Sequence, residues 1–287
     1  MKEISVEEII SAVENLCIET NYNLGSDIMM GFHQALKDEP SPLGREVLER
    51  LIDNAEIAKE EQVPMCQDTG MVVLFLSIGQ DLHVVGGSLT EAINEGVRRG
   101  YAKGYLRKSV VKDPFERVNT RDNTPAIIHY DIVPGDELHL IVAPKGFGSE
   151  NMGGLKMCKP SEGIEGAMQF VVDTVDQAGG NPCPPIIVGV GVGGTMEKAT
   201  FLAKKGLLRE VGQHNPEVRL ANIEKELLER INRLGIGPLG FGGVTTALAV
   251  NIEVFPTHIA GMPVAVNIGC HATRHKEITL QGRECND

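Results

Sequence analysis

The sequence predicts an α/β fold in which mixed sheets are flanked by helices. Short apolar runs typical of buried strands alternate along the chain with longer amphipathic segments typical of helices. Apolar residues make up 42% and charged residues 23%, which is ordinary for a globular protein, while 33 glycines supply many turns. We expect residues 1–287 to form one domain, and a chain of this length also allows that domain to consist of two lobes.

The first elements have clear start signals. Ser5 and Glu8 form a capping-box pattern that predicts an N-terminal helix, and residues 41–61 form a second amphipathic pattern. The apolar run 71–79 predicts a buried strand. The segment starting at Ser88 predicts a capped helix that continues to about residue 104.

The middle of the chain predicts a hairpin and a glycine-rich loop. The apolar runs 126–133 and 137–145 flank Pro134-Gly135-Asp136, a sequence typical of a tight turn between paired strands. Residues 145–154 are rich in glycine, and residues 162–178 predict a helix.

The last part of the chain alternates strands and helices. Residues 184–194 predict a strand with a glycine turn that leads into a helix over 195–208. Asn215-Pro216 predicts a capped helix to about residue 234. Two final strands are expected at 245–255 and 263–271.

Gly189, Gly191 and Gly194 match the G-x-G-x-x-G pattern of dinucleotide-binding proteins between a strand and a helix. The second strand ending in an acidic residue, which such a site needs, is missing, because another helix follows. The sequence therefore favours a tightly packed turn, or a close backbone approach to some other anion.

Charge and hydropathy exclude several classes of function. The net charge of −12 argues against a nucleic-acid surface, and an anionic substrate would need local arginine or lysine. No apolar run approaches the length of a membrane span, and the acidic start MKEISVEEII is unlike a targeting peptide. We expect a cytoplasmic protein without a membrane partner.

Three of the six cysteines lie at glycine- or proline-rich corners beside apolar runs: Cys66, Cys183 and Cys270. In the cytoplasm structural disulfides are not expected, and no CxxC pair indicates a zinc site. Spacing alone favours three buried thiols, although turns at strand ends also allow the three to converge.

The motifs around these cysteines are specific. CQDTG, KGFGSENMGGLKM, NPCPPIIVGVGVGGT and GMPVAVNIGCHATRH resemble signature segments of the iron–sulfur (class I) fumarate hydratases and the related L-tartrate dehydratases. The resemblance is to their alpha subunit, or the N-terminal domain of the single-chain form, and spans residues 10–276. It implies a fumarase class I alpha-type domain.

The resemblance also implies a cofactor. In that family three thiolates hold a [4Fe–4S] cluster whose fourth iron lacks a protein ligand, and the matching residues are Cys66, Cys183 and Cys270. Such an iron acts as a Lewis acid. Cys17 and Cys158 are expected to be small apolar fillers, and Cys285 a thiol in a polar tail.

Asp68, two residues from Cys66, is the first acid/base candidate, and Gln67 is expected to donate hydrogen bonds to the substrate. The resemblance adds His258 as a catalytic residue, and Arg107 and the loop with Gly148 and Ser149 as substrate-binding groups. Residue type alone favours other interpretations: an Asp-Thr-Gly turn for Asp68, a structural histidine for His258 and a solvated basic face for Arg107. His271, beside Cys270, is expected to orient its loop.

The implied reaction is the reversible hydration of fumarate to L-malate, as in the tricarboxylic acid cycle. The alternative within the family is L-tartrate dehydration to oxaloacetate, and a third hypothesis is a metal-binding regulatory subunit without catalysis. The single-chain enzymes continue into a C-terminal swivelling domain, whereas this sequence ends shortly after Cys270. We therefore expect a separate beta subunit, in an α2β2 assembly, to complete a site for a small dicarboxylate.

Overall fold

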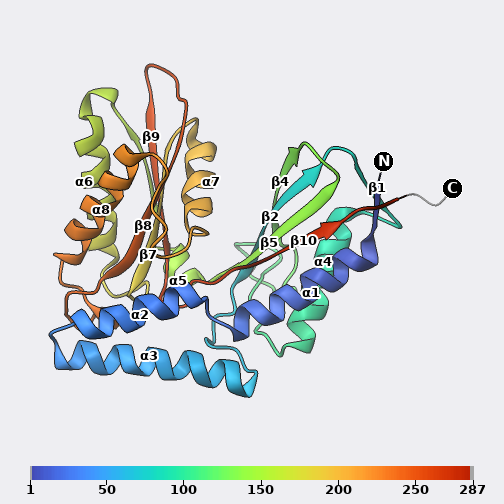
Figure 1. The fold of residues 1–287 in the computed structure, drawn as a ribbon, viewed down its shortest axis with the longest axis horizontal. Helices are drawn as coiled ribbons and strands as arrows, with labels where there is room; N and C mark the ends of the chain where they lie inside the picture. Colours follow the sequence, from blue (N-terminus) through green and yellow to red (C-terminus); the bar gives the residue numbers. More distant parts are fainter. Residues whose placement is uncertain (1, 285–287) are drawn as a thin grey trace. The chain divides into compact units, whose positions relative to one another are not determined.

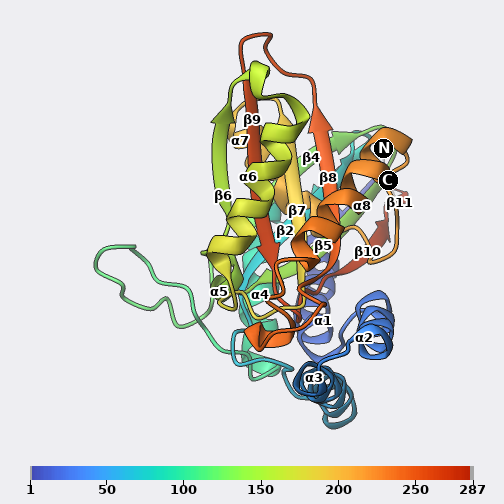
Figure 2. The ribbon, with the colours of Figure 1, turned by 90° about the vertical axis from the view of Figure 1, so that its left-hand side faces the viewer.

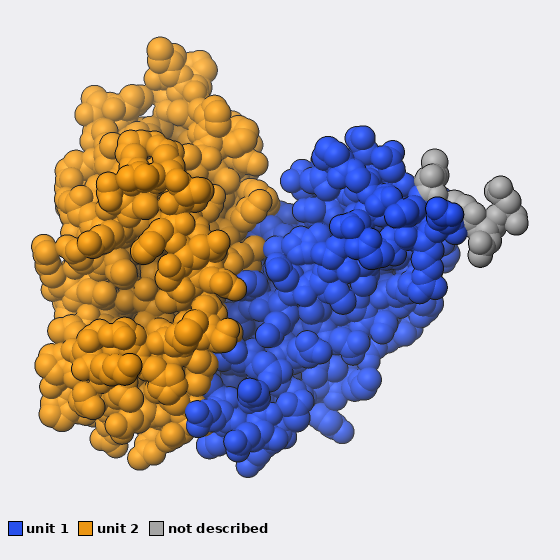
Figure 3. Space-filling model, viewed as in Figure 1, with its two compact units in different colours: residues 1–24, 55–146, 274–287 blue, residues 25–54, 147–273 orange. Residues whose placement is uncertain are grey.

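The computed structural model describes residues 2–284, and this part of the chain forms two compact units (Figure 3). Unit 1 contains residues 2–24, 55–146 and 274–284, and unit 2 contains residues 25–54 and 147–273. Helices and three sheets of mixed composition confirm the predicted α/β class (Figure 1). Within residues 2–284 no helix is long and apolar enough to cross a bilayer.

Unit 1 is built on a four-stranded sheet with the order β10-β5-β2-β4. Helices α1 and α4 pack side by side against this sheet (Figure 1), and the core between them is mostly aliphatic, with Tyr22 and Tyr101 also buried in it. A smaller sheet with the order β11-β1-β3 lies at the start of α1. The bounds are β1 Lys2–Ser5, α1 Val6–Tyr22, β2 Met71–Gly79, β3 Leu82–Val85, α4 Leu89–Lys103, β4 Ile127–Val133, β5 Glu137–Lys145, β10 Lys276–Gln281 and β11 Arg283–Glu284.

Local signals explain where these helices begin. The Glu8 amide donates to Ser5 Oγ at 3.3 Å and the Ser5 amide donates to Glu8 Oε2 at 3.2 Å, so the predicted capping box is present. Ser88 caps α4 in the same way through the Glu91 amide. Both predicted helix starts are confirmed.

The predicted hairpin is wrong, because β2 lies between its two strands. β2 pairs parallel to β4 on one side and antiparallel to β5 on the other. β2 is buried on both faces and takes the central place, whereas β4 is an exposed edge strand. The amides of Gln80 and Asp81, which follow β2, donate to the carbonyls of Val133 and Gly135 and so occupy the gap that a hairpin would close.

Unit 2 is a three-layer α/β/α arrangement around a sheet with the order β6-β9-β7-β8. Figure 1 shows α6 and α8 on one face of this sheet and α7 on the other. Its strands are β6 Gly154–Cys158, β7 Ile186–Gly193, β8 Ala247–Phe255 and β9 Met262–Gly269. The helices are α2 Ser26–Asp38, α5 Phe147–Glu150, α6 Gly163–Ala178, α7 Met196–Gly206 and α8 Val218–Asn232, and α3 Pro42–Glu61 belongs to unit 2 as far as Asn54.

Helix α8 begins later than the Asn215-Pro216 signal predicts. Asn215 accepts a hydrogen bond from the Glu217 amide at 3.0 Å and donates from Nδ2 to the Ile252 carbonyl at 2.9 Å. Its side chain therefore ties the preceding loop to β8 instead of capping the helix, whose first residue is Val218. Helix α2 and the short strands β1, β3, β6 and β10 were not predicted from the sequence.

The glycine fingerprint is a packing feature. Gly189 and Gly191 lie within β7, and a Cβ atom on either would stand 2.0 Å from a carbonyl oxygen of α7, that of Ala203 or Ala199. Among the glycines of residues 189–194, Gly193 and Gly194 at the end of the strand have positive φ, of 94° and 67°. The glycines of β7 let α7 approach the sheet closely, as the tight-packing interpretation predicts.

Candidate functional site

The sheet of unit 2 brings two of the three candidate cysteines into neighbouring turns. β7 and β9 are antiparallel, with Ile187 opposite Gly269, so Cys183 before β7 and Cys270 after β9 lie at the same end of the sheet. The His271 amide donates to the Cys183 carbonyl at 3.1 Å, and His271 Nδ1 lies 3.1 Å from the same oxygen. His271 thus joins the two turns, consistent with an orienting role.

Cys183 has a special backbone. It stands between prolines in NPCPP and has a φ of 56°, a left-handed conformation that non-glycine residues rarely adopt. Such conformations cost of order 1–3 kcal/mol and persist where surrounding contacts impose them, often at functional sites. Its side chain is exposed, and that of Cys270 is half-buried.

The segment α5 lies beside these turns. An added Cβ on Gly148 would stand 4.0 Å from the carbonyl oxygen of Asn181, two residues before Cys183. Ser149 is buried. Glu150 accepts a hydrogen bond from Asn267 Nδ2 at 3.1 Å and pairs with Lys204 of α7, so α5 is held against the end of β9 from two sides.

Cys66 lies in unit 1, in the turn that leads into β2. The Asp68 amide donates to Cys66 Sγ at 3.4 Å, and the thiol donates to Gln67 Oε1 at 3.5 Å. Amide hydrogen bonds to sulfur are among the contacts that tune thiolate-ligated clusters. The hydroxyl of buried Tyr101 donates to the Thr69 carbonyl at 2.6 Å and supports the turn from α4.

Asp68 makes both the turn contact and a contact towards the loop after β5. Its Oδ1 accepts from the Gly70 amide at 3.0 Å, which is the Asp-Thr-Gly turn expected from residue type alone. Its Oδ2 faces Gly146, at 3.1 Å from the place where a Cβ would stand. The absence of a side chain at Gly146 therefore leaves space beside this oxygen.

Arg107 is close to the same turn. Its carbonyl oxygen accepts from the Thr69 hydroxyl at 2.9 Å, while its side chain is exposed. Unit 1 therefore places the Cys66–Asp68 turn, Arg107 and Gly146 together.

His258 is not brought to the cysteine end of the sheet. It lies in the exposed loop between β8 and β9, where its Nδ1 accepts from the Ala260 amide at 3.2 Å. Cys270 follows the other end of β9, and a strand of 8 residues spans roughly 26 Å. The structure therefore places His258 and Cys270 at opposite ends of β9, and the catalytic role of His258 stays a prediction.

The five described cysteines fall into two groups, and none of these five forms a disulfide. Cys17 and Cys158 are buried, and burial raises the pKa of each thiol, which disfavours a thiolate. Cys66, Cys183 and Cys270 lie in turns with accessible side chains. Accessible thiols are of the residue type that binds iron–sulfur clusters, whose iron favours soft thiolate ligands. Cys285 lies outside the described residues.

The described part of the chain contains no group of three or more His, Cys, Asp or Glu side chains that could hold a single metal ion. A mononuclear metal site is therefore not found within residues 2–284.

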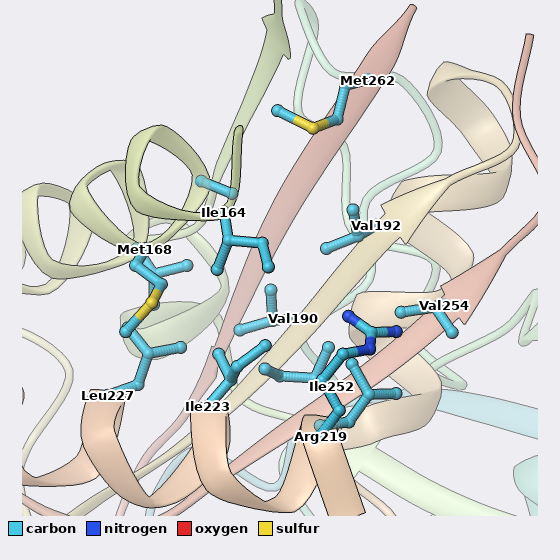
Figure 4. A pocket seen from close by; sticks show the side chains of 13 residues that line it. Ile164, Met168, Val190, Val192, Arg219, Ile223, Leu227, Ile252, Val254 and Met262 are labelled. Atoms are coloured by element: carbon cyan, nitrogen blue, oxygen red, sulfur yellow. The ribbon is translucent and has the colours of Figure 1, made fainter. Parts of the chain in front are cut away.

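A hollow with an empty volume of about 490 Å³, partly open to solvent, lies between α6, α8 and the sheet of unit 2 (Figure 4). Its lining includes Ile164, Met168, Ile223 and Ile252, and its charged member, Arg219, pairs with Glu217 at 2.8 Å. An apolar hollow of this kind lacks the groups that would bind a dicarboxylate.

Sequence reasoning missed Arg274, which is buried in unit 1. Its guanidinium donates to Asn21 Oδ1 and to the Asp68 carbonyl, both at 2.9 Å, and so holds the Cys66–Asp68 turn against α1. The signal was its position in GCHATRH, within the motif that carries Cys270.

Comparison with known proteins agrees with this arrangement of motifs. The fumarate hydratase (Fumerase) family profile matches residues 10–279. A Methanocaldococcus jannaschii protein described as a candidate L(+)-tartrate dehydratase subunit alpha is 44% identical over 284 residues, covering 96% of this chain and 99% of the relative. The L(+)-tartrate dehydratase subunit alpha of Escherichia coli K12 is 32% identical over 290 residues, covering 98% and 95%.

The chain has an α/β fold with thiols at strand ends, and the family profile and the relatives match it over nearly its whole length. It is therefore an enzyme of the hydro-lyase class. The chain belongs to the fumarate hydratase (Fumerase) family. The resemblance inferred from its motifs is confirmed.

Proposed function

We propose that this chain is the alpha subunit of an iron–sulfur hydro-lyase that reversibly hydrates fumarate to L-malate. The observation that carries the proposal is the pairing of the Cys183 and Cys270 turns through His271, which places two accessible thiols at one end of the unit 2 sheet. Membership of the fumarate hydratase family supports the reaction class.

In this proposal Cys66, Cys183 and Cys270 hold a [4Fe–4S] cluster. When bound, the cluster supplies Lewis acidity from an iron that has no protein ligand, which polarises the C–O bond of the 2-hydroxy acid. Of these three cysteines, Cys66 belongs to unit 1, and Cys183 and Cys270 belong to unit 2. The chain passes between the units at four places, and two of these, Gly146–Phe147 and Thr273–Arg274, lie within or next to the family motifs in the sequence.

The substrate carboxylates are bound by Arg107 and by the segment carrying Gly148 and Ser149. A guanidinium matches a carboxylate with two parallel hydrogen bonds, which offsets the repulsion between an anionic substrate and a chain of net charge −12. Glycine at 148 allows the backbone to approach the ligand. Gln67 is exposed next to Cys66 and donates from its amide to a substrate oxygen.

Asp68 exchanges the proton with the substrate. In dehydration, a carboxylate at Asp68 accepts the proton from the carbon next to the substrate carboxylate, and the C–H electron pair forms the double bond as the C–O bond breaks. The departing hydroxide takes up a proton from solvent and leaves as water, and Asp68 releases the proton it accepted to solvent, so the protons balance. The Gly70 amide, bonded to Oδ1, orients this carboxylate, while Oδ2 faces the space at Gly146. His258, at the other end of β9, takes part only if a neighbouring copy of the chain supplies it.

A beta subunit completes the site, in an α2β2 assembly. The relatives named above are called subunit alpha and match this chain over almost their whole length. We further propose a cytoplasmic location, since a reducing compartment maintains accessible thiols of the kind seen at Cys66, Cys183 and Cys270.

L(+)-tartrate dehydration is a second candidate, because both relatives carry that name. Tartrate differs from malate by one hydroxyl group. A polar group in the pocket that bonds this hydroxyl would discriminate strongly between the two substrates.

Anaerobic co-expression with the beta subunit tests the proposal. Iron and sulfide content, visible absorbance, and rates with malate, fumarate and both tartrates are measured on the purified complex. We expect a brown complex with about four irons per chain and hydro-lyase activity. A colourless, iron-free complex without activity would refute it, and the ratio of malate to tartrate rates decides between the two candidates.

Cysteine variants test the ligand set. Cys183→Ser should abolish iron retention, whereas Cys158→Ser, a matched change at a buried thiol, should leave the iron content unchanged. Loss of iron from Cys158→Ser with retention in Cys183→Ser would show that the ligands are assigned wrongly.

A further inference from the structure

Residues 107–121 of unit 1 form an extended arm between α4 and β4, seen as the long loop that projects to the left in Figure 2. A short ladder closes the arm. Val111 bridges Asn119, the Lys112 amide donates to the Val118 carbonyl at 2.8 Å, and the Thr120 amide donates to the Val110 carbonyl at 2.9 Å. The arm therefore has a defined shape despite lying outside the main sheet.

The tip of the arm presents apolar side chains to solvent. Phe115 is 92% exposed and Val118 is 53% exposed. Asp113 Oδ1 accepts from the amides of Phe115 and Glu116, both at 2.8 Å, so a side-chain-capped turn holds the phenyl ring outward. An aromatic ring held on a projecting turn has a low entropic cost of binding, because the turn is already ordered.

The root of the arm is bonded to the candidate site. Asn123 is fully buried, and its Oδ1 accepts from the Ser109 amide at 2.7 Å while its Nδ2 donates to the Gly70 carbonyl at 3.1 Å. The Thr69 hydroxyl donates to the Arg107 carbonyl at 2.9 Å. Thr69 and Gly70 end the turn that carries Cys66 and Asp68, so the arm and this turn form one bonded structure.

The charge of the arm is opposite to that of the chain. It contains five basic residues and two acidic ones, whereas the whole chain has a net charge of −12. The basic residues are Arg107, Lys108, Lys112, Arg117 and Arg121, and the acidic ones are Asp113 and Glu116. The chemistry of the tip fits an apolar socket with an acidic rim.

We infer that residues 107–121 are the docking arm for the beta subunit, with Phe115 and Val118 entering an apolar socket that carboxylates surround. This inference rests on the proposed function, which requires such a subunit. The base of the arm, at Arg107 and Ser109, is bonded to the end of the Cys66–Asp68 turn. This position favours the beta subunit as the partner, because a subunit bound to the arm lies near the site that the beta subunit is proposed to complete.

The test measures the dissociation constant between the purified chain and the beta subunit. The variants are Phe115→Ser and Arg117→Glu, and the matched control is Ile132→Ser, which removes an apolar side chain that is 74% exposed on β4 of the same unit. Phe115→Ser should weaken binding at least tenfold, as expected for a buried aromatic contact. Arg117→Glu should slow association and reduce its salt dependence, and Ile132→Ser should change neither.

The readouts separate the arm from the proposed function. Each variant alone should melt like the native chain, since Phe115 and Arg117 are exposed. Unchanged affinity of Phe115→Ser for the beta subunit overturns the inference while leaving the hydro-lyase proposal intact. If Phe115→Ser loses self-association but still binds the beta subunit, the inference is also overturned, because the arm then binds a second copy of this chain. A native chain that binds no beta subunit refutes the partner proposal itself, and iron content and activity test the reaction separately.

Discussion

Replacing Gly191 by alanine tests the close packing of α7 on the unit 2 sheet. A Cβ at this position would lie 2.0 Å from the Ala199 carbonyl oxygen, 2.7 Å from the Ala203 nitrogen and 2.9 Å from Leu202 Cβ. Ordinary contact begins at 3.4 Å, so α7 must retreat from β7 by more than 1 Å. The opposing atoms are mostly backbone, and rotation of a side chain does not relieve the clash.

Overpacking a well-packed interior costs about 1–3 kcal/mol, and the rigid backbone contacts place Gly191→Ala near 3 kcal/mol. At about 2–4 °C per kcal/mol for a protein of this size, the melting temperature should fall by about 6–12 °C. Gly189→Ala presses on α7 in the same direction, with its Cβ 2.0 Å from the Ala203 carbonyl oxygen. The double variant should therefore cost less than the sum of the two.

Urea denaturation and thermal melts followed by circular dichroism measure these changes. Gly261→Ala is the matched control, because no atom lies within 4 Å of its added Cβ and its φ is ordinary. It should be neutral, or stabilise by up to about 0.5 kcal/mol through the unfolded chain. If Gly191→Ala unfolds within about 0.5 kcal/mol of this control, the packing explanation of the glycine fingerprint is wrong.

Three further predictions concern buried and titrating groups. Glu224→Ala should lower the free energy of unfolding by about 1–3 kcal/mol in urea titrations, because it removes the buried acceptor of the Ile252 amide and one of the two carboxylate partners of half-buried Arg209, which keeps Glu253 at 2.7 Å; a loss under about 0.5 kcal/mol would contradict this. Burial tends to raise the Asp122 pKa, but hydrogen bonds from Thr124 and Arg98 outweigh this effect and leave the pKa below its usual value. The ionised Asp122 carboxylate therefore stabilises the folded chain above about pH 4, and this stabilisation is lost as the pH falls through the folded-state pKa. Asp122→Asn should accordingly be less stable than the native chain at neutral pH and converge with it in acid, and a gap that is independent of pH would disprove the linkage. Iodoacetamide at neutral pH should alkylate exposed Cys183 in the cluster-free chain and spare Cys17, whose pKa is raised by burial, until urea unfolds the chain; peptide mass spectrometry checks the order.

Local signals in the sequence predicted many elements correctly. The caps at Ser5 and Ser88 and the boundaries of β2 follow from hydrogen bonds and side-chain periodicity within a few residues. One misplaced helix start has a cause distant in sequence. The side chain of Asn215 bonds the Ile252 carbonyl of β8, so the Asn-Pro pattern precedes α8 instead of capping it.

The order of strands depended on tertiary contacts. The turn at Pro134-Gly135-Asp136 exists, but β2 enters between β4 and β5 because only β2 is apolar enough to be buried on both faces. The residues of the turn do not reveal that a strand distant in sequence, β2, pairs with both strands that the turn connects.

The candidate site divides in the same way. The sequence by itself determined the family, the three corner cysteines and the contrast with Cys158, because those depend on residue types in contiguous motifs. Only the tertiary structure decided that the Cys183 and Cys270 turns meet through the β7–β9 register, and that Arg274 holds the Cys66–Asp68 turn. It also decided that His258 lies at the opposite end of β9. These results depend on strand direction and strand length, which set where side chains distant in sequence come together.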